Sequence, residues 1–505
     1  MYAYYIICIL TIEKNALPPP HPSLRPPRPN SVRRPPLGTP PLLHTRFSPT
    51  QLLRRFHQLL PVSLLAGWLA LSERAFYQRA FTPLVTLWYL VFQRLDPNHA
   101  LSHVQDDARD GGADRLSPPG KPLSRQITSE STSAYSDARQ RLPLSFLLQT
   151  LGHVAAQFGR AFQGPLSFGL RIALLDGSTF RLRPFGDIPQ HFPPHRPGNC
   201  TKPPYWCVAR VVGALCWATG AVLDTALGSL KQSEQALCAG LLQARSWAGW
   251  LLLGDRNFGV YSVARSIVAA QGQALLRMTE VRARKLARTA GWRHQLRPGL
   301  DLALDWSPSA RDQYPEGITP APVPGRLLVA QIRRPGYRPL RLYLFTTLLD
   351  PVPGPVWQLV ELYAQRWNIE VYFRYIKAQM DLDFLEPHSA DLARKEWLAG
   401  MIAYNLIRWA MAAAAARAKV PVLRLSFCRA RSLLLGWLDR SPRHRRSTRS
   451  WSRLLNRISQ AQQPKRRKRR PSEPRAVRLL KNHFPVLEGT RAAAREKLAK
   501  AHANS

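Results

Sequence analysis

Acidic residues are scarce in this chain of 505 residues, in which 31 Asp and Glu stand against 72 Lys and Arg, for a formal net charge of +41. Such an excess of positive charge favours a polyanionic partner, either nucleic acid or an anionic membrane surface. Long hydrophobic runs are also missing, because the longest, such as WLLLG and MAAAAA, fall far short of the roughly 20 residues that cross a bilayer. Nucleic acid is therefore the favoured partner.

Cysteine is sparse, and none of the six cysteines forms a CxxC pair or stands near histidine at zinc-finger spacing. This spacing disfavours a structural zinc site. His191 and His195, in a Pro-rich segment, also lack metal-ligand spacing and are expected at the surface. A basic chain of this size with scattered cysteines is typical of a reduced, intracellular protein.

The first 46 residues carry no pattern of a folded core. The start, MYAYYIICILTIEKN, lacks the basic n-region and the small-residue cleavage site of a signal peptide. Residues 16–46 are rich in Pro and Arg and cannot bury enough apolar surface to pack. We expect residues 1–46 to be disordered.

The rest of the chain divides into stretches that differ in their pattern of apolar, polar and basic residues. Residues 47–165 carry apolar residues at helical spacing, interrupted by a polar, loop-like segment near residues 105–132. From residue 166, short apolar strands alternate with helical patterns, which predicts an α/β sheet with crossover helices. Residues 280–356, rich in Pro, Gly and alternating runs, are expected to be a β-rich insertion. The tail from about residue 440, including PKRRKRRP at 464–471, is basic and expected to be flexible.

Because acidic residues are few, their positions are informative. Asp176 and Asp255 each follow an apolar run, in LLDGST and LLLGDR, and are predicted at the carboxyl ends of buried strands. In open α/β sheets, functional sites collect at those strand ends. Asp224, after AVL, is predicted to be a structural turn residue instead.

A third acid, Glu370, lies in the segment LYAQRWNIEVYFRYIKAQM, residues 362–380. On a regular helix, Tyr363, Arg366, Glu370 and Lys377 fall on one stripe about 60° wide. An apolar stripe runs beside it and predicts the face that packs on the core. A carboxylate flanked by cations along one line suggests a site for a polyanion and a metal, although an Arg–Glu pair four residues apart also decorates many exposed helices. The apolar stripe is Leu362, Ile369, Phe373, Ile376 and Met380.

Asp176, Asp255 and Glu370 together match the chemistry of phosphoryl transfer on nucleic acids. Three carboxylates can hold two Mg²⁺ ions, with Mn²⁺ as a substitute. One ion activates the attacking water or 3′-hydroxyl, and the other stabilises the leaving oxygen. The cations and the phenol on the stripe would hold phosphates.

Several motifs resemble those of a known family. DGSTF at 176–180, LLLGDRNFGVY at 251–261 and the spacing Y-x2-R-x3-E-x6-K at 363–377 resemble bacterial insertion-sequence transposases of the Asp-Asp-Glu type. Among these the chain resembles the insertion sequence 4 family, to which TSAYSDARQRLP and IAYNLIRWAM are also similar. The resemblance covers roughly residues 50–490, and the Pro-rich front end departs from it.

The resemblance implies an α/β fold with a ribonuclease-H-like core, a mixed sheet with flanking helices, at residues 166–425. The β-rich insertion at 280–356 would interrupt this core, a helical DNA-binding domain at 47–165 would precede it, and a basic region at 426–505 would follow. It implies Mg²⁺-dependent cleavage at terminal inverted repeats and strand transfer into target DNA, by a homodimer on paired ends in the bacterial cytoplasm.

The same resemblance assigns roles to single residues. Asp176, Asp255 and Glu370 would bind the metal ions, and Tyr363, Arg366 and Lys377 would hold phosphates near a flipped base. An aromatic ring would stack on that base. Trp306 and Trp292 are the candidates.

Two other classes of protein stay open. A DNA-binding relic could keep the fold without activity, but it would not need carboxylates that repel phosphate in the absence of metal. A nuclease on the same fold could cleave without joining ends, but it would not need the Tyr-Arg-Glu-Lys stripe to hold a specific end.

Overall fold

The computed structural model describes residues 44–45, 80–117, 120–194, 205–310, 312, 317–332, 340–439, 448–463 and 489–503. The expected disorder of residues 1–43, the predicted helices before residue 80, His195 and the PKRRKRRP run lie outside the described residues. His44 and Thr45 were expected to be disordered, but they form strand β1, which pairs antiparallel with β2, Phe162–Gln163.

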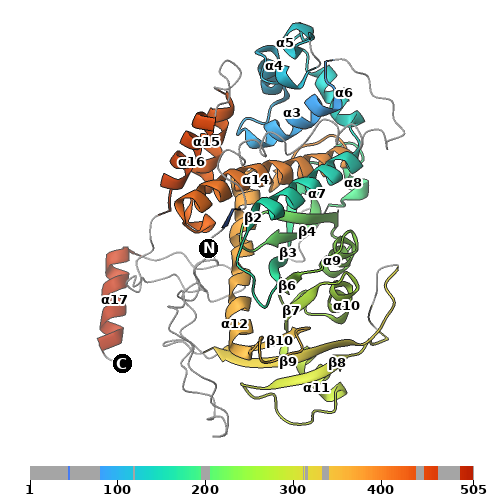
Figure 1. Cartoon of the computed structure of the whole chain (residues 1–505), viewed down its shortest axis with the longest axis vertical. Helices are drawn as coiled ribbons and strands as arrows, with labels where there is room; N and C mark the ends of the chain where they lie inside the picture. Colours follow the sequence, from blue (N-terminus) through green and yellow to red (C-terminus); the bar gives the residue numbers. More distant parts are fainter. Residues whose placement is uncertain are drawn as a thin grey trace. The chain divides into compact units, whose positions relative to one another are not determined.

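A nine-stranded mixed sheet runs through the unit that ends at Gln462 (Figure 1). Its order is β5-β4-β3-β6-β7-β10-β9-β8, with β11 beside the second half of β3. The strands are β3 Arg171–Leu182, β4 Cys207–Cys216, β5 Val222–Ser229, β6 Trp250–Gly254, β7 Gln273–Met278, β8 Asp301–Trp306, β9 Val323–Ile332, β10 Leu340–Thr346 and β11 Phe384–Leu385.

The first five of these strands give the ribonuclease-H-like topology that was predicted. Strands β3, β4 and β5 form an antiparallel meander, and β6 and β7 then add parallel to β3 on its other side. The chain crosses from β5 to β6 through α9, Glu234–Gln243, and from β6 to β7 through α10, Tyr261–Ala269. Parallel neighbours need such crossovers, so the α/β prediction is confirmed.

The β-rich segment at 280–356 extends this same sheet. Its strand β10 pairs antiparallel with β7, and β9 and β8 continue outward from β10. One feature differs from the sequence prediction, because the segment opens with a helix, α11, Glu280–Thr289, whose start is capped by Thr279. Its alternating Arg and Lys residues concealed the narrow apolar face of Ala283, Leu286 and Ala287.

Two layers of helices cover the two faces of the sheet. Alternate residues of β3 separate them, since Ile172 and Leu174 pack in one cluster and Ala173 and Leu175 in the other. The second cluster includes α9 and α10. The first cluster includes α3 Pro83–Leu95, α7 Leu144–Ala161, α12 Val356–Ala364, α13 Asn368–Arg374, α14 Ala390–Ala418, α15 Phe427–Asp439 and α16 Thr448–Gln460.

Helix α14 organises the helical layer, because α3, α7, α15 and α16 all pack against it (Figure 1). By length and composition alone this helix could cross a membrane, but 94% of its most apolar stretch is buried inside the protein. Its Trp397, Tyr404 and Trp409 are buried. Such burial is typical of a core helix.

Two sequence predictions about helices were wrong. The polar segment near 105–132 contains the end of α4, Leu101–Arg109, and the short helix α5, Leu123–Gln126, before α6, Ser133–Arg141. The tail from about residue 440 was expected to be flexible, but α16 is folded and packs on α14 through an apolar face that includes Trp451 and Leu455. Residues 463–505 form a separate unit that contains α17, Arg491–Ala503.

Candidate active site

Asp176 and Asp255 lie at the same level of the sheet, although not as predicted. Asp255 follows the last residue of β6, as expected. Asp176 was expected at the end of its strand, but β3 continues through Gly177 and Ser178 to Leu182, because all of these residues pair with β4. The parallel pairing of β3 with β6 ends at Leu174 and Leu253, and extending this register by two residues places Asp176 beside Asp255.

Glu370 comes from a helical segment that is less regular than predicted. Helix α12 ends at Ala364, a 3₁₀ turn spans Gln365–Trp367, α13 carries Glu370, and a π-helical turn spans Tyr375–Gln379. The predicted apolar stripe is confirmed, since all five of its residues are buried. The departures from α-geometry change the angle between residues along the segment.

A buried arginine links two of the three acids. Nη1 of Arg366 lies 3.4 Å from Oδ2 of Asp176, and its Nη2 lies 3.7 Å from Oε1 of Glu370. Only 5% of Arg366 is exposed. Burial lowers the pKa of Arg366, but Tyr363 and the three acids outweigh burial and leave that pKa raised.

The acids also act on one another. Burial raises the pKa of Asp176 to about 7, with Arg366 opposing the shift and Asp255 and Glu370 adding to it. The pKa of Glu370 is raised for the same reasons, burial first, with Arg366 opposing and Asp255 adding. The three carboxylates therefore share one electrostatic environment in which negative charge is poorly compensated.

This donor set suits a divalent cation. Carboxylate oxygens are the ligands that Mg²⁺ prefers, and a bound cation would favour the charged form of Asp176, whose pKa burial raises first and the neighbouring acids raise further. In the described part of the chain, no three His, Cys, Asp or Glu side chains lie close enough to enclose one ion. Between Asp176 and Glu370 the intervening group is the Arg366 guanidinium.

Tyr363 and Arg277 lie next to the three acids and Arg366, and the sequence analysis missed Arg277. The Tyr363 hydroxyl is buried without a hydrogen-bond partner among the described residues. Burial raises its pKa, against the charges of Arg366 and Arg277. Arg277, on β7, interacts electrostatically with Tyr363 and Asp255, and burial lowers its own pKa. The sequence feature that could have identified Arg277 is that it is the one charged residue in the strand QALLRM.

Lys377 does not join the acids. It lies in the π-helical turn, where burial lowers its pKa and its electrostatic neighbours are Asp383 and Arg181. Arg181 and Asp383 form an ion pair of 3.7 Å near the far end of β3. The predicted single stripe is thus divided, with Tyr363, Arg366 and Glu370 at the acids and Lys377 farther along β3.

The two candidate stacking residues are partly buried and pack against the second core cluster. The ring of Trp306 lies edge-on to Phe345 and Tyr261, with centroids 4.8 and 6.1 Å away. Trp292 packs edge-on to His294. Among the contacts between described residues, none joins either ring to the acids, so the base-stacking role stays a prediction.

Asp224 lies inside β5 and not in a turn, contrary to the prediction. Burial raises its pKa to about 6, while the hydrogen bond from the Thr225 backbone N–H and the charge of Arg245 oppose this shift.

His191 was expected at the surface. It lies on the short helix α8, Ile188–His191, where its Nε2 is 3.4 Å from a carboxylate oxygen of Asp187, and both side chains are about half exposed.

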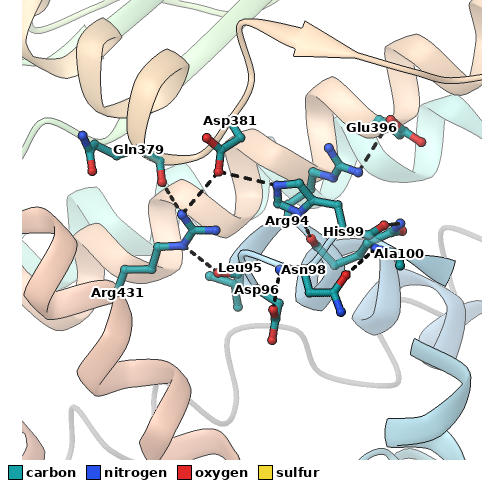
Figure 2. A network of polar contacts seen from close by, with 11 residues as sticks. Arg94, Leu95, Asp96, Asn98, His99, Ala100, Gln379, Asp381, Glu396 and Arg431 are labelled. Carbon is teal, nitrogen blue, oxygen red and sulfur yellow. Dashed lines mark hydrogen bonds and ion pairs between the residues drawn. The ribbon is translucent and has the colours of Figure 1, made fainter. Parts of the chain in front are cut away.

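The end of the segment that carries Glu370 is anchored by the surrounding helices (Figure 2). Arg431 of α15 donates through Nε to the Leu95 carbonyl at 2.7 Å and through Nη1 to the Gln379 carbonyl. It also faces Asp381, whose Oδ2 lies 3.8 Å from Nη1 and 3.7 Å from Nε2 of His99. Helices that precede and follow the strands of the large sheet in the sequence therefore meet at this point.

Comparison with known proteins agrees with this arrangement. Residues 167–406 match the family described as the transposase DDE domain, a range that contains all three acids. The chain is 25% identical over 285 residues to the transposase InsG of insertion sequence element IS4 from Escherichia coli (strain K12). That alignment covers 55% of this chain and 61% of the relative, so the chain spans less than two thirds of that protein.

A solved structure, a piggyBac transposase synaptic complex with hairpin DNA, aligns with 81% of this chain and 85% of its own, at 12% identity and a TM-score of 0.38. A likeness of that degree carries no weight beside the strand order. The family match and the curated relative agree: residues 167–406 are similar to a transposase DDE domain, and the chain is similar to the transposase of a bacterial insertion sequence.

Proposed function

We propose that this chain is the DNA transposase of an insertion sequence, which binds the terminal inverted repeats of its element, cleaves DNA there and transfers the end into target DNA. The observation that carries this proposal is the convergence of Asp176, Asp255 and Glu370, from three separate elements, around the buried guanidinium of Arg366. A stable fold gains nothing from three acids that repel one another, whereas metal-dependent phosphoryl transfer needs them.

In this proposal Asp176, Asp255 and Glu370 hold divalent metal, Mg²⁺ in the cell. When bound, Mg²⁺ lowers the pKa of the attacking hydroxyl and offsets charge on the leaving oxygen. Asp176 is half-buried on a strand that pairs with β4 on both sides of it, and Asp255 accepts a hydrogen bond from the backbone N–H of Asn257, so both carboxylates belong to hydrogen-bonded backbone. Pre-set ligands of this kind favour a fixed metal geometry.

Three further residues are assigned to the DNA end. Arg366 and Tyr363 each carry a buried polar atom without a protein partner among the described residues, Nε and the hydroxyl respectively, and such atoms suit phosphate oxygens. Lys377 would contact a phosphate farther along the strand, because it lies beside Arg181 and not beside the acids. The partner is double-stranded DNA, and the family resemblance suggests a homodimer on two paired ends in the bacterial cytoplasm.

The test is cleavage of a labelled duplex that carries the terminal repeat of the element, with Mg²⁺ or with EDTA. We expect the wild-type protein to cut at the repeat end and join it to a second DNA with Mg²⁺ only. Glu370→Gln should lose at least a thousandfold in rate, because metal-assisted charge stabilisation supplies about 4 kcal/mol or more. Glu386→Gln, in an ion pair with Arg183 at the surface, is the matched control.

Two outcomes would contradict the proposal. If the wild-type protein and Glu370→Gln both shift the duplex in a gel but neither cuts it, the chain is a DNA-binding relic. If the wild-type protein cuts with Mg²⁺ but never joins the end to a second DNA, it is a nuclease.

A further inference from the structure

The turn that carries Asp255 is held by the first turn of α9. Within the turn, the backbone N–H of Asn257 donates to Oδ1 of Asp255 at 2.7 Å. The Asn257 side chain then donates through Nδ2 to Oε2 of Glu234. Nε2 of Gln235 donates to Oδ1 of Asn257 at 2.6 Å and to its carbonyl at 2.9 Å.

This network leaves Asn257 one orientation. Its amide nitrogen needs an acceptor, which Glu234 supplies, and its amide oxygen needs a donor, which Gln235 supplies. With the side chain fixed, the backbone N–H of Asn257 stays directed at Asp255, so one carboxylate oxygen is occupied and the other is left for a ligand. The orientation of Asp255 therefore depends on Glu234 through a single intermediate residue.

Gly177, the residue after Asp176, is part of the same arrangement. A Cβ atom at Gly177 would lie 2.6 and 2.7 Å from the two carboxylate oxygens of Glu234. Any side chain at this position would displace the Glu234 carboxylate from Asn257, since these separations are far below normal contact. The strand that carries Asp176 thus leaves room for the group that orients Asp255.

We propose that Glu234 is a positioning residue of the active site, which acts through Asn257 to orient the Asp255 carboxylate for metal. The inference rests on the proposed metal-binding role of Asp255. Hydrogen bonds of this kind to a metal-binding group typically change metal affinity or activity by about 10- to 100-fold when removed.

A simpler role for Glu234 must be separated from this one. It is the first residue of α9, directly after the Ser233 cap, and an acid there is favourable for any helix. Glu280 offers a matched control, because it is the first residue of α11, directly after the Thr279 cap, and its side chain pairs with Arg284 in the same helix.

The experiment compares Glu234→Ala, Glu234→Gln, Asn257→Ala and Glu280→Ala with the wild-type protein. Affinity for Mn²⁺ is measured without DNA, from the electron paramagnetic resonance signal of the free ion, and the single-turnover rate of end cleavage is measured with Mg²⁺. We expect Glu234→Ala and Asn257→Ala each to weaken Mn²⁺ binding and slow cleavage by about tenfold or more. The double variant should be no worse than either single one, because both act through the same contact.

Glu234→Gln is the decisive variant. Its side-chain oxygen can still accept from Nδ2 of Asn257, so we expect Mn²⁺ affinity and rate within about threefold of the wild type. If Glu234→Gln is instead as impaired as Glu234→Ala, the charge of Glu234 acts on the metal directly and the positioning role is wrong. If Glu234→Ala behaves as Glu280→Ala does, Glu234 is only a helix-terminal acid and the inference also fails.

Two further comparisons keep the result interpretable. Should Glu234→Ala not fold, Gly177→Ala displaces the same carboxylate without removing it and is expected to give the same loss of Mn²⁺ affinity. If the wild-type protein binds Mn²⁺ tightly but cuts no DNA, the proposed transposase activity fails while the positioning role remains tested by affinity. If the wild-type protein binds no Mn²⁺, the metal site itself is wrong and this inference falls with it.

Discussion

Arg366 and Arg431 are both buried arginines at the helical segment 362–380, but Arg366 lies within the segment near its start, whereas Arg431 comes from α15 and contacts the end of the segment. The contacts of Arg366 are carboxylates at 3.4 and 3.7 Å, longer than the 2.7–2.9 Å of a good charge-assisted hydrogen bond. Arg431 instead donates to the backbone carbonyls of Leu95 and Gln379, at 2.7 Å for the first.

These two sets of contacts suit two different roles: Arg431 anchors the segment, and Arg366 makes contacts that a ligand could replace. A carbonyl in the backbone of a packed helix cannot leave, so Arg431 fixes where the segment ends relative to α3 and α15 (Figure 2). Loose ion pairs at Arg366 can be exchanged for a metal ion and a phosphate without breaking a well-formed hydrogen bond. The proposed site thus has one end of its helical segment fixed by backbone hydrogen bonds and the other held by longer ion pairs, which suits the binding of charged ligands.

Of the variants that test this comparison between Arg366 and Arg431, Arg431→Met is expected to have the largest effect, a loss of stability. The variant leaves the carbonyls of Leu95 and Gln379 buried without their donor, and two hydrogen bonds from a charged group are lost. We expect a loss of about 3 kcal/mol in the free energy of unfolding, measured by urea denaturation. Arg429→Met, at an exposed position two residues earlier on α15, is the control. Equal losses in both variants would show that Arg431 is no anchor.

The next effect is expected from Arg366→Met, at the other end of the segment. Removing a positive charge from among three carboxylates should tighten Mn²⁺ binding by at least about tenfold, because the guanidinium and the metal compete for the same oxygens. Calorimetric titration of the DNA-free protein with Mn²⁺ measures this change, with the exposed Arg374→Met as control. Weaker Mn²⁺ binding in Arg366→Met would mean that the guanidinium supports the metal site instead of competing for it.

The same segment illustrates what the sequence could predict. Its apolar stripe is buried as expected, because a period near 3.6 reports which side of a helix meets the core. The same period could not reveal the 3₁₀ turn at Gln365–Trp367 or the π-helical turn at Tyr375–Gln379, since it assumes one regular helix throughout. Lys377 was therefore placed on the stripe in the sequence analysis but lies beside Arg181.

For the strands that carry Asp176 and Asp255, the sequence was informative to a similar extent. The apolar runs before Asp176 and Asp255 predicted both strands, and burial of those runs confirms them. Asp176 was predicted to end its strand, but the long pairing of β3 with β4 carries the strand on through Gly177 and Ser178. Contacts such as those of Arg431 with Leu95 and of Glu234 with Asn257 join residues far apart in sequence, and one sequence carries no signal for such pairs.

A smaller change is expected from Lys377→Gln, which tests whether the far end of the stripe serves DNA and not metal. Lys377 is assigned to one phosphate, so its removal should lower the slope of log affinity against log salt by about 0.9, with a several-fold loss of end binding at low salt. Affinity for Mn²⁺ should not change, because its electrostatic neighbours are Asp383 and Arg181. Fluorescence anisotropy with a labelled terminal repeat measures the slope, and Lys231→Gln, at an exposed turn, is the control.

The smallest effect concerns His99, which lies in the anchored network of Arg431. Burial lowers the pKa of His99 from its ordinary value of 6.5, as do the charges of Arg94 and Arg431, while the Gln93 carbonyl and Asp381 oppose the shift. The unfolded chain therefore binds a proton more readily than the folded one, and the contribution to stability is complete above pH 6.5 and is lost as the pH falls through the folded-state pKa.

The variant His99→Gln does not titrate. Its amide can still donate to the Gln93 carbonyl, as Nδ1 of His99 does at 2.6 Å. Between pH 8 and pH 5.5 the free energy of unfolding should thus fall less in His99→Gln than in the wild type, by under about 1 kcal/mol. An equal fall in both proteins would mean that His99 is free to take up a proton in the folded state, and that the anchored end of the segment is looser than its hydrogen bonds indicate.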